Sequence, residues 1–163
     1  MGKKNGMTSS DQLAAYLQPR LGPEFLGVFS SDTLPPSFKR PAKMIANYSP
    51  AGTPGTHWVA MTFPSHGPAQ YFSSYGLRPD AADGILNTHT QFRRYLDDHG
   101  ADGWVASTYD LQALGDDECG EWSVWALLYG LPRPESADWA PFLAIRSKHQ
   151  RDQAIRAAVG IRE

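Results

Sequence analysis

The order of its predicted elements makes this chain an α+β domain, with helices packed on a small mixed or antiparallel sheet. Strand-like segments fill the centre of the sequence, a helix and one more strand follow, and the last third is helical in pattern. The chain has 163 residues and 41% of them are hydrophobic, which is enough for one domain with a sizeable core. No linker divides it, so we expect a single domain over residues 8–163 after a loose N-terminal tail over residues 1–7.

Turn signals separate the expected elements in the first half of the chain. Ser9 or Ser10 can cap a helix over residues 11–17, which we expect to end before Pro19. A stretch rich in Ser, Pro and Asp, residues 27–41, predicts an ordered surface loop. Short apolar runs bounded by Pro and Gly predict three strands, over residues 44–48, 56–63 and 68–73.

Helical spacing returns in the second half. Phe92, Tyr95 and Leu96 predict a helix over residues 90–99, which Gly100 ends. A strand is expected over residues 104–109, and an apolar run of helix length then extends over residues 119–129. One or two amphipathic helices over residues 141–161 carry a basic face, which we interpret as a solvated surface formed by Arg146, Lys148, Arg151 and Arg156.

Composition excludes several classes of function. A net charge of −2 provides no general attraction to nucleic acid or to anionic membranes, so we do not expect a nucleic-acid partner. The single cysteine excludes an internal disulfide and a cysteine-based zinc site, and it suits a reducing compartment. No segment approaches the roughly 18 apolar residues of a membrane span. We expect a monomer without a metal or other cofactor.

That single cysteine stands at a position suited to a nucleophile. Cys119 follows the acidic turn 115–118 and opens the apolar run, so we expect it in the first turn of a helix. Free N–H groups and the helix dipole favour the thiolate there. Gly120 leaves room for a substrate carbonyl to approach. The alternative is a buried structural thiol, because free cysteine is among the most buried residue types.

Two other side chains supply the remaining parts of an acyl-transfer site. His57 stands at the beginning of a predicted strand, where a general base can face a cleft. Gln112 precedes Cys119 by seven residues, and its amide can donate to the oxygen of a tetrahedral intermediate. A hydrogen-bonded strand histidine and an ordinary glutamine after a strand are the alternatives. Four further histidines are interpreted as solvated: His66, His89, His99 and His149.

Five motifs in order resemble the adenovirus-type cysteine endopeptidases (adenain) and the similar proteases of adenovirus-like viruses and large mobile DNA elements. The resemblance covers roughly residues 27–130. It implies a papain-like or adenain-like architecture with Cys119 as nucleophile, His57 as base, and Gln112 with the Cys119 N–H as oxyanion hole. It also implies that Trp58 lines a narrow channel for small residues such as Gly. The motifs are residues 27–35, 44–47, 55–60, 71–76 and the pair 111–112 with 119–120.

The chain departs from this family at the acid position. The family carries Asp or Glu where this chain has Ser73. Three interpretations stay open: a Cys–His dyad with the Ser73 hydroxyl orienting the imidazole, recruitment of another carboxylate such as Asp32 or Asp80, or a weakened or inactive relative. The dyad is plausible because a thiol needs less activation than a hydroxyl.

The resemblance further implies what the enzyme would act on. The leading hypothesis is an endopeptidase that cleaves viral capsid or core precursor proteins at Gly-containing sites, in the host cell nucleus or the virion. The alternatives are an isopeptidase that removes ubiquitin or SUMO-like proteins, and an inactive homologue that keeps the groove for binding. An activating peptide is an implied partner, but it cannot form a disulfide with this chain, because Cys119 is the only cysteine.

Overall fold

A five-stranded mixed sheet forms the centre of the molecule. The computed structural model describes residues 6–80 and 90–162. In space the strands follow their order in the chain. The outer pairs, β1 with β2 and β4 with β5, are parallel, and β3 runs antiparallel to both of its neighbours. The strands are β1 (Phe25–Phe29), β2 (Ala42–Asn47), β3 (Trp58–Phe63), β4 (Ala69–Phe72) and β5 (Trp104–Ala106).

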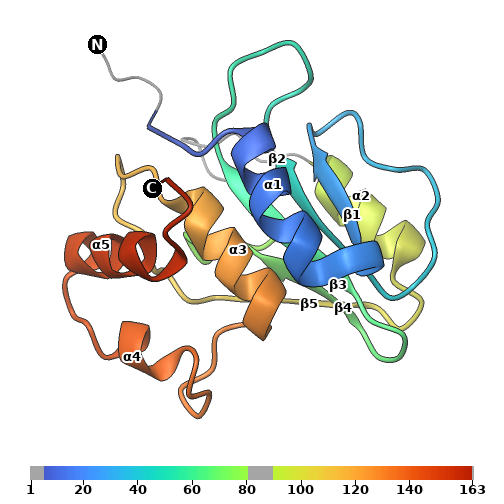
Figure 1. The fold of residues 1–163 in the computed structure, drawn as a ribbon. Coiled ribbons are helices and arrows are strands. Elements are labelled where there is room, and N and C mark those ends of the chain that lie inside the picture. Colours follow the sequence, from blue (N-terminus) through green and yellow to red (C-terminus); the bar gives the residue numbers. More distant parts are fainter. Residues whose placement is uncertain (1–5, 81–89, 163) are drawn as a thin grey trace.

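Helices cover both faces of this sheet (Figure 1). The first face is covered by α1 (Ser10–Leu21) and α3 (Cys119–Tyr129), with α4 (Ala140–Leu143) and α5 (Lys148–Val159) packed outside α3. On the opposite face lies α2 (Thr90–His99). A short 3-10 turn, η1 (Gly22–Glu24), links α1 to β1. None of the helices within the described ranges is long and apolar enough to cross a membrane.

Alternating side chains of the central strand divide the core into two clusters. On β3, Trp58 and Ala60 pack among the residues of α1 and α3, whereas Val59 and Met61 pack among those of α2. This period of two is what a strand buried on both faces requires. His57 directly precedes β3, and its ring packs against Tyr48 of the second cluster.

Most sequence-based element predictions agree with the structure. The predicted α+β class with a small mixed sheet is confirmed, and so are Ser9 as N-cap and the bounds of α2 and α3. The prediction that the first helix ends before Pro19 is wrong, since α1 continues to Leu21. There Arg20 Nη1 donates to the Tyr16 carbonyl and its guanidinium stacks 3.6 Å above the Tyr16 ring. These contacts support the turn that the proline weakens.

Two further expectations differ from the structure. The loop expected over residues 27–41 begins within β1, because pairing with β2 recruits residues 25–29 into the sheet. Gly6 and Met7, expected in a loose tail, contact Arg162 and Cys119. Residues 1–5 of that tail, and His89, lie outside the described residues.

Candidate active site

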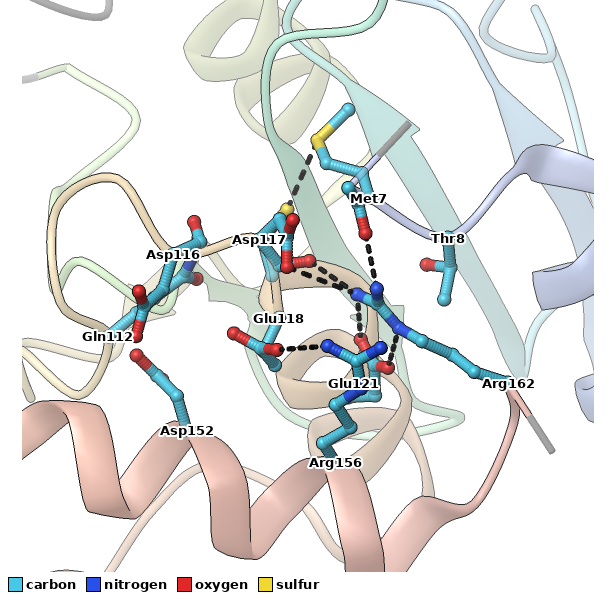
Figure 2. Close-up of polar contacts among 12 residues, drawn as sticks. Met7, Thr8, Gln112, Asp116, Asp117, Glu118, Glu121, Asp152, Arg156 and Arg162 are labelled. Atoms are coloured by element: carbon cyan, nitrogen blue, oxygen red, sulfur yellow. Dashed lines mark hydrogen bonds and ion pairs between the residues drawn. The ribbon is translucent and has the colours of Figure 1, made fainter. Parts of the chain in front are cut away.

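Cys119 is the first residue of α3, as its sequence context predicts, but its side chain is only 2% exposed. Its Sγ accepts a hydrogen bond from the Trp58 backbone N–H at 3.4 Å. The thiol in turn donates to Met7 Sδ at 3.5 Å (Figure 2). Met7 and Trp58, which lie 112 and 61 positions from Cys119 in the chain, therefore both contact its sulfur atom.

The backbone N–H groups at the helix N-terminus favour the thiolate, as expected, but burial outweighs them in this conformation. Burial, with a smaller contribution from nearby Glu121, raises the pKa of the Cys119 thiol to about 12. Hydrogen bonds from the backbone N–H groups of Trp58, Gly120 and Cys119 itself act in the opposite direction but are outweighed. Since desolvation penalises the charged form, the sulfur is a neutral thiol here.

His57 is a buried, neutral imidazole. Its Nε2 lies 3.1 Å from Ser73 Oγ, and its ring stacks on Tyr75 with centroids 4.7 Å apart and meets the Tyr48 ring edge-on at 5.1 Å. Burial lowers the His57 pKa to about 3. If Ser73 accepts the Nε2 proton, Nδ1 is the unprotonated atom of the ring and is able to take a proton.

The backbone next to His57 contacts the thiol. The amide that binds Cys119 Sγ belongs to Trp58, the residue directly after His57. Among the described residues, no hydrogen bond joins His57 to Cys119 itself, and the His57 ring packs against Ser73, Tyr48 and Tyr75. The thiol and the imidazole therefore do not form a thiolate–imidazolium pair in this conformation.

Ser73 is the group that contacts the imidazole from the acid position. It is fully buried, and its Oγ also accepts the Tyr75 backbone N–H at 3.3 Å. The other carboxylates considered are engaged elsewhere: Asp32 Oδ1 accepts the Ala51 N–H at 2.8 Å, and Asp80 pairs with Arg78 at 3.0 Å. Their recruitment in place of Ser73 is not seen in this conformation.

Both polar atoms of the Gln112 side-chain amide form hydrogen bonds. Its Oε1 accepts Ser74 Oγ at 2.6 Å, and its Nε2 donates to the Asp116 carbonyl at 2.6 Å. The side chain is buried within the loop that leads into α3. One Nε2 hydrogen serves the Asp116 carbonyl, and the described residues provide no acceptor for the second.

The two predicted substrate-binding residues are both covered by residues before α1. Trp58 Nε1 donates to the Thr8 carbonyl at 2.9 Å. A Cβ added to Gly120 would overlap Thr8 Oγ1, so Gly120 does leave room, but Thr8 fills it. Trp58 itself borders two open depressions of about 490 and 450 Å³. The first is lined by residues 6–9, 54–56 and Trp58, and the second by parts of β1 and the loop after β2.

Buried charges beside the site were not predicted from the sequence. Glu121 is fully buried, and its carboxylate accepts from Arg162 Nε at 2.6 Å. Asp152 of α5 accepts from Trp122 Nε1 at 2.8 Å and from the Ala113 N–H at 2.9 Å. Burial and the adjacent Asp116 raise the Asp152 pKa to about 7. The sequence signal that could have revealed these charges was an acidic residue, Glu121, within the apolar run of α3.

The carboxylates of Asp116, Glu118 and Asp152 lie within 4.8 Å of one another, so they are close enough to share a cation. Each already has a partner, however. Asp116 pairs with His149 at 2.9 Å, Glu118 pairs with Arg156 at 3.2 Å, and Asp152 accepts two N–H groups. We therefore assign no metal to this cluster.

Three members of the expected basic face on the C-terminal helices bind the protein itself. Lys148 pairs with Asp110 at 2.6 Å and Arg156 with Glu118. Arg151 donates to the carbonyls of residues 110, 142 and 145. The side chains of Lys148 and Arg156 are still 44% and 49% exposed, as expected of a solvated surface, but these contacts leave less free positive charge for a polyanion.

Comparison with known proteins adds no family assignment: neither a protein-family model nor a curated protein matches this chain.

Proposed function

We propose that the protein is a cysteine endopeptidase of the adenain-like type, with Cys119 as nucleophile and His57 as base. The observation that carries the proposal is the bond from the Trp58 N–H to Cys119 Sγ, because it joins the strand that bears His57 to the N-terminus of α3. A nucleophile at a helix N-terminus beside an oriented imidazole is the arrangement that thiol acyl transfer requires.

In the proposed reaction, His57 Nδ1 takes the proton of the Cys119 thiol as the sulfur attacks a peptide carbonyl. The resulting imidazolium donates that proton to the leaving amine, and a thioester forms on Cys119. His57 then activates a water molecule, which hydrolyses the thioester and releases the free thiol. Ser73 takes part by accepting the Nε2–H, which keeps Nδ1 unprotonated.

The oxyanion of the tetrahedral intermediate would accept hydrogen bonds from the Cys119 N–H and from Gln112 Nε2. The bonds of Gln112 to Ser74 and Asp116 hold its amide in one orientation before substrate arrives. Such preorganised donors typically contribute 10²–10³ in rate each. Gln112→Ala should therefore lower kcat by about that factor with a smaller change in KM.

The substrates we propose are viral capsid or core precursor proteins cut at Gly-containing sites, with the host nucleus or virion as location. This choice depends on the motif resemblance. An isopeptidase acting on ubiquitin-like proteins uses the same residues and stays an alternative. A binding module without activity is the second candidate, and the burial of the thiol with its raised pKa favours it.

The test is cleavage of a peptide library that includes Gly-Gly and Gly-X-Gly sequences, followed by mass spectrometry of the products. The wild-type chain, Cys119→Ala and His57→Ala are compared, together with a ubiquitin vinyl sulfone that reports the isopeptidase alternative. We expect Cys119-dependent products that end in Gly. Cleavage that persists in Cys119→Ala contradicts the proposal. So does its absence both from the wild-type chain and from a chain that begins at Ser9.

A further inference from the structure

Four residues ahead of α1 cross the candidate site. Residues 6–9, called here the covering segment, run from the N-cap of α1 past the N-terminus of α3 (Figure 2). Met7 Sδ lies 3.5 Å from Cys119 Sγ. Its thioether therefore occupies the side of the sulfur that a substrate carbonyl would otherwise approach.

Thr8 lies deeper in the site than Met7. It is 2% exposed, and its carbonyl accepts Trp58 Nε1 at 2.9 Å, so the segment uses the indole as a peptide ligand would. Its side chain contacts Gly120, directly after the nucleophile. Among the described residues, Thr8 Oγ1 has no hydrogen-bond partner although it is buried. Burying a hydroxyl without a hydrogen-bond partner costs free energy. The contact at Thr8 therefore stabilises the covered state less than a fully paired contact would, which makes the segment easier to displace.

Arg162 ties the covering segment to α3. Its guanidinium donates to the Gly6 carbonyl, to the Asp117 carbonyl at 2.8 Å and to the buried Glu121 carboxylate at 2.6 Å. The same side chain thus holds a backbone group of the segment and two groups at the beginning of α3. The charge-assisted bond to Glu121 fixes the guanidinium in place.

The segment also borders an open groove. The depression of about 490 Å³ has residues 6–9 as one wall and residues 54–56 with Trp58 as the other. A second depression shares Gly55 and Trp58 with it and continues toward the exposed edge of the sheet at Val28 and Phe29. A peptide chain is the ligand that fits an extended path of this kind, because it can use backbone groups along its length.

We propose that the covering segment is a tethered peptide that lines the substrate-binding groove, blocks the approach from it to Cys119 and keeps the thiol inaccessible until the segment is displaced. This inference rests on the proposed function for the identity of the groove. Its physical content, that residues 6–9 control access to the thiol, is testable without any substrate.

The first experiment measures the rate at which iodoacetamide alkylates Cys119, followed by intact-mass spectrometry. We compare the full chain, a chain that begins at Gly6 and a chain that begins at Ser9, which keeps the N-cap of α1. The chain that begins at Ser9 should react at least about tenfold faster than the full chain, since its thiol has lost the Met7 and Thr8 cover. The chain that begins at Gly6 should react as slowly as the full chain.

A second experiment displaces the segment without shortening the chain. Gly120→Ala places a methyl group against Thr8 Oγ1 and should raise the alkylation rate by a similar factor. Adding Thr8→Ala removes that oxygen, leaves the Thr8 Cβ 3.4 Å from the new methyl group, and should restore slow alkylation. Circular dichroism and thermal melting confirm that each variant is folded.

The two proposals fail in different ways. Equal alkylation rates in the full chain and in folded chains that begin at Ser9 or carry Gly120→Ala overturn the role of the covering segment. Fast alkylation of the chain that begins at Ser9 supports that role. If this chain still cleaves no peptide, and if His57→Ala within it does not change the pH dependence of alkylation, the protease proposal fails while the covering role stands.

Discussion

A buried carboxylate lies on each side of the α3 N-terminus, and the two carboxylates have different partners. On the flank of the covering segment, the Glu121 carboxylate is paired with the Arg162 guanidinium. On the flank of the 111–118 loop, Asp152 is matched by N–H donors, and its pKa rises to about 7. A buried carboxylate is stabilised as an anion where a cation faces it, and it favours its proton where burial and neighbouring carboxylates outweigh the N–H dipoles that face it. One flank should therefore respond to loss of a cation and the other to pH.

The largest expected effect comes from breaking the pair on the first flank. Arg162→Met leaves the Glu121 carboxylate buried without a cation, which should lower the free energy of unfolding by about 3–5 kcal/mol. Urea denaturation measures it. The double variant Glu121→Gln/Arg162→Met should recover most of the loss. A single variant as stable as wild type would show that the Arg162–Glu121 pair does not stabilise the fold.

The stability that the His57 imidazole contributes should fall in acid. Because the pKa of His57 is lowered from 6.5 to about 3, the folded protein binds its proton less readily than the unfolded chain does. Stability from this group is full above pH 6.5 and is lost as pH falls toward 3, on the order of 4 kcal/mol. His57→Gln should reduce that pH dependence in urea titrations. An imidazole NMR signal that titrates near pH 6.5 contradicts this prediction.

The second flank should respond to pH in the opposite sense. The raised pKa of Asp152 means that the folded protein holds this proton more tightly than the unfolded chain. Its contribution is present below pH 3.8 and is lost as pH rises through about 7, by roughly 1 kcal/mol because water screens part of it. Comparing wild type with Asp152→Asn at pH 5 and 8 tests this. The loss on going to pH 8 should be smaller in the variant, and an unchanged loss assigns it to other groups.

The smallest effect concerns two adjacent hydroxyls at the covering segment. Thr8→Val replaces an unpartnered buried hydroxyl with a methyl group and should raise stability by up to about 1 kcal/mol. Ser9→Ala removes the N-cap of α1, whose Oγ accepts the Gln12 N–H, and should lower it by about 1 kcal/mol. Thermal melting distinguishes the two. A loss in Thr8→Val would mean that its hydroxyl has a partner after all.

Local patterns predicted the parts of the site well. The apolar run from Cys119 to Gly130 predicted the bounds of α3, and the pattern after Gly55 predicted a strand at His57, which in the structure begins one residue later at Trp58. These features depend on neighbours within a few residues, which the sequence displays directly.

Contacts between distant segments could not be predicted in this way. Arg162 and Gly6 are 156 positions apart, and Cys119 and Met7 are 112 apart. Strand β1 was missed because its pairing with β2, and not its own pattern, makes it a strand. Such contacts depend on how whole elements pack, and many packings are compatible with one local pattern.

The sequence by itself determined which reactive atoms the protein has and on which elements they stand: one sulfur opening a helix, one imidazole before a strand, one amide in the loop between. Only the tertiary structure decided their protonation and accessibility. Met7 and Trp58 contact the sulfur, and Tyr48, Ser73 and Tyr75 contact the imidazole. The resulting burial among residues far apart in sequence makes thiol and imidazole neutral.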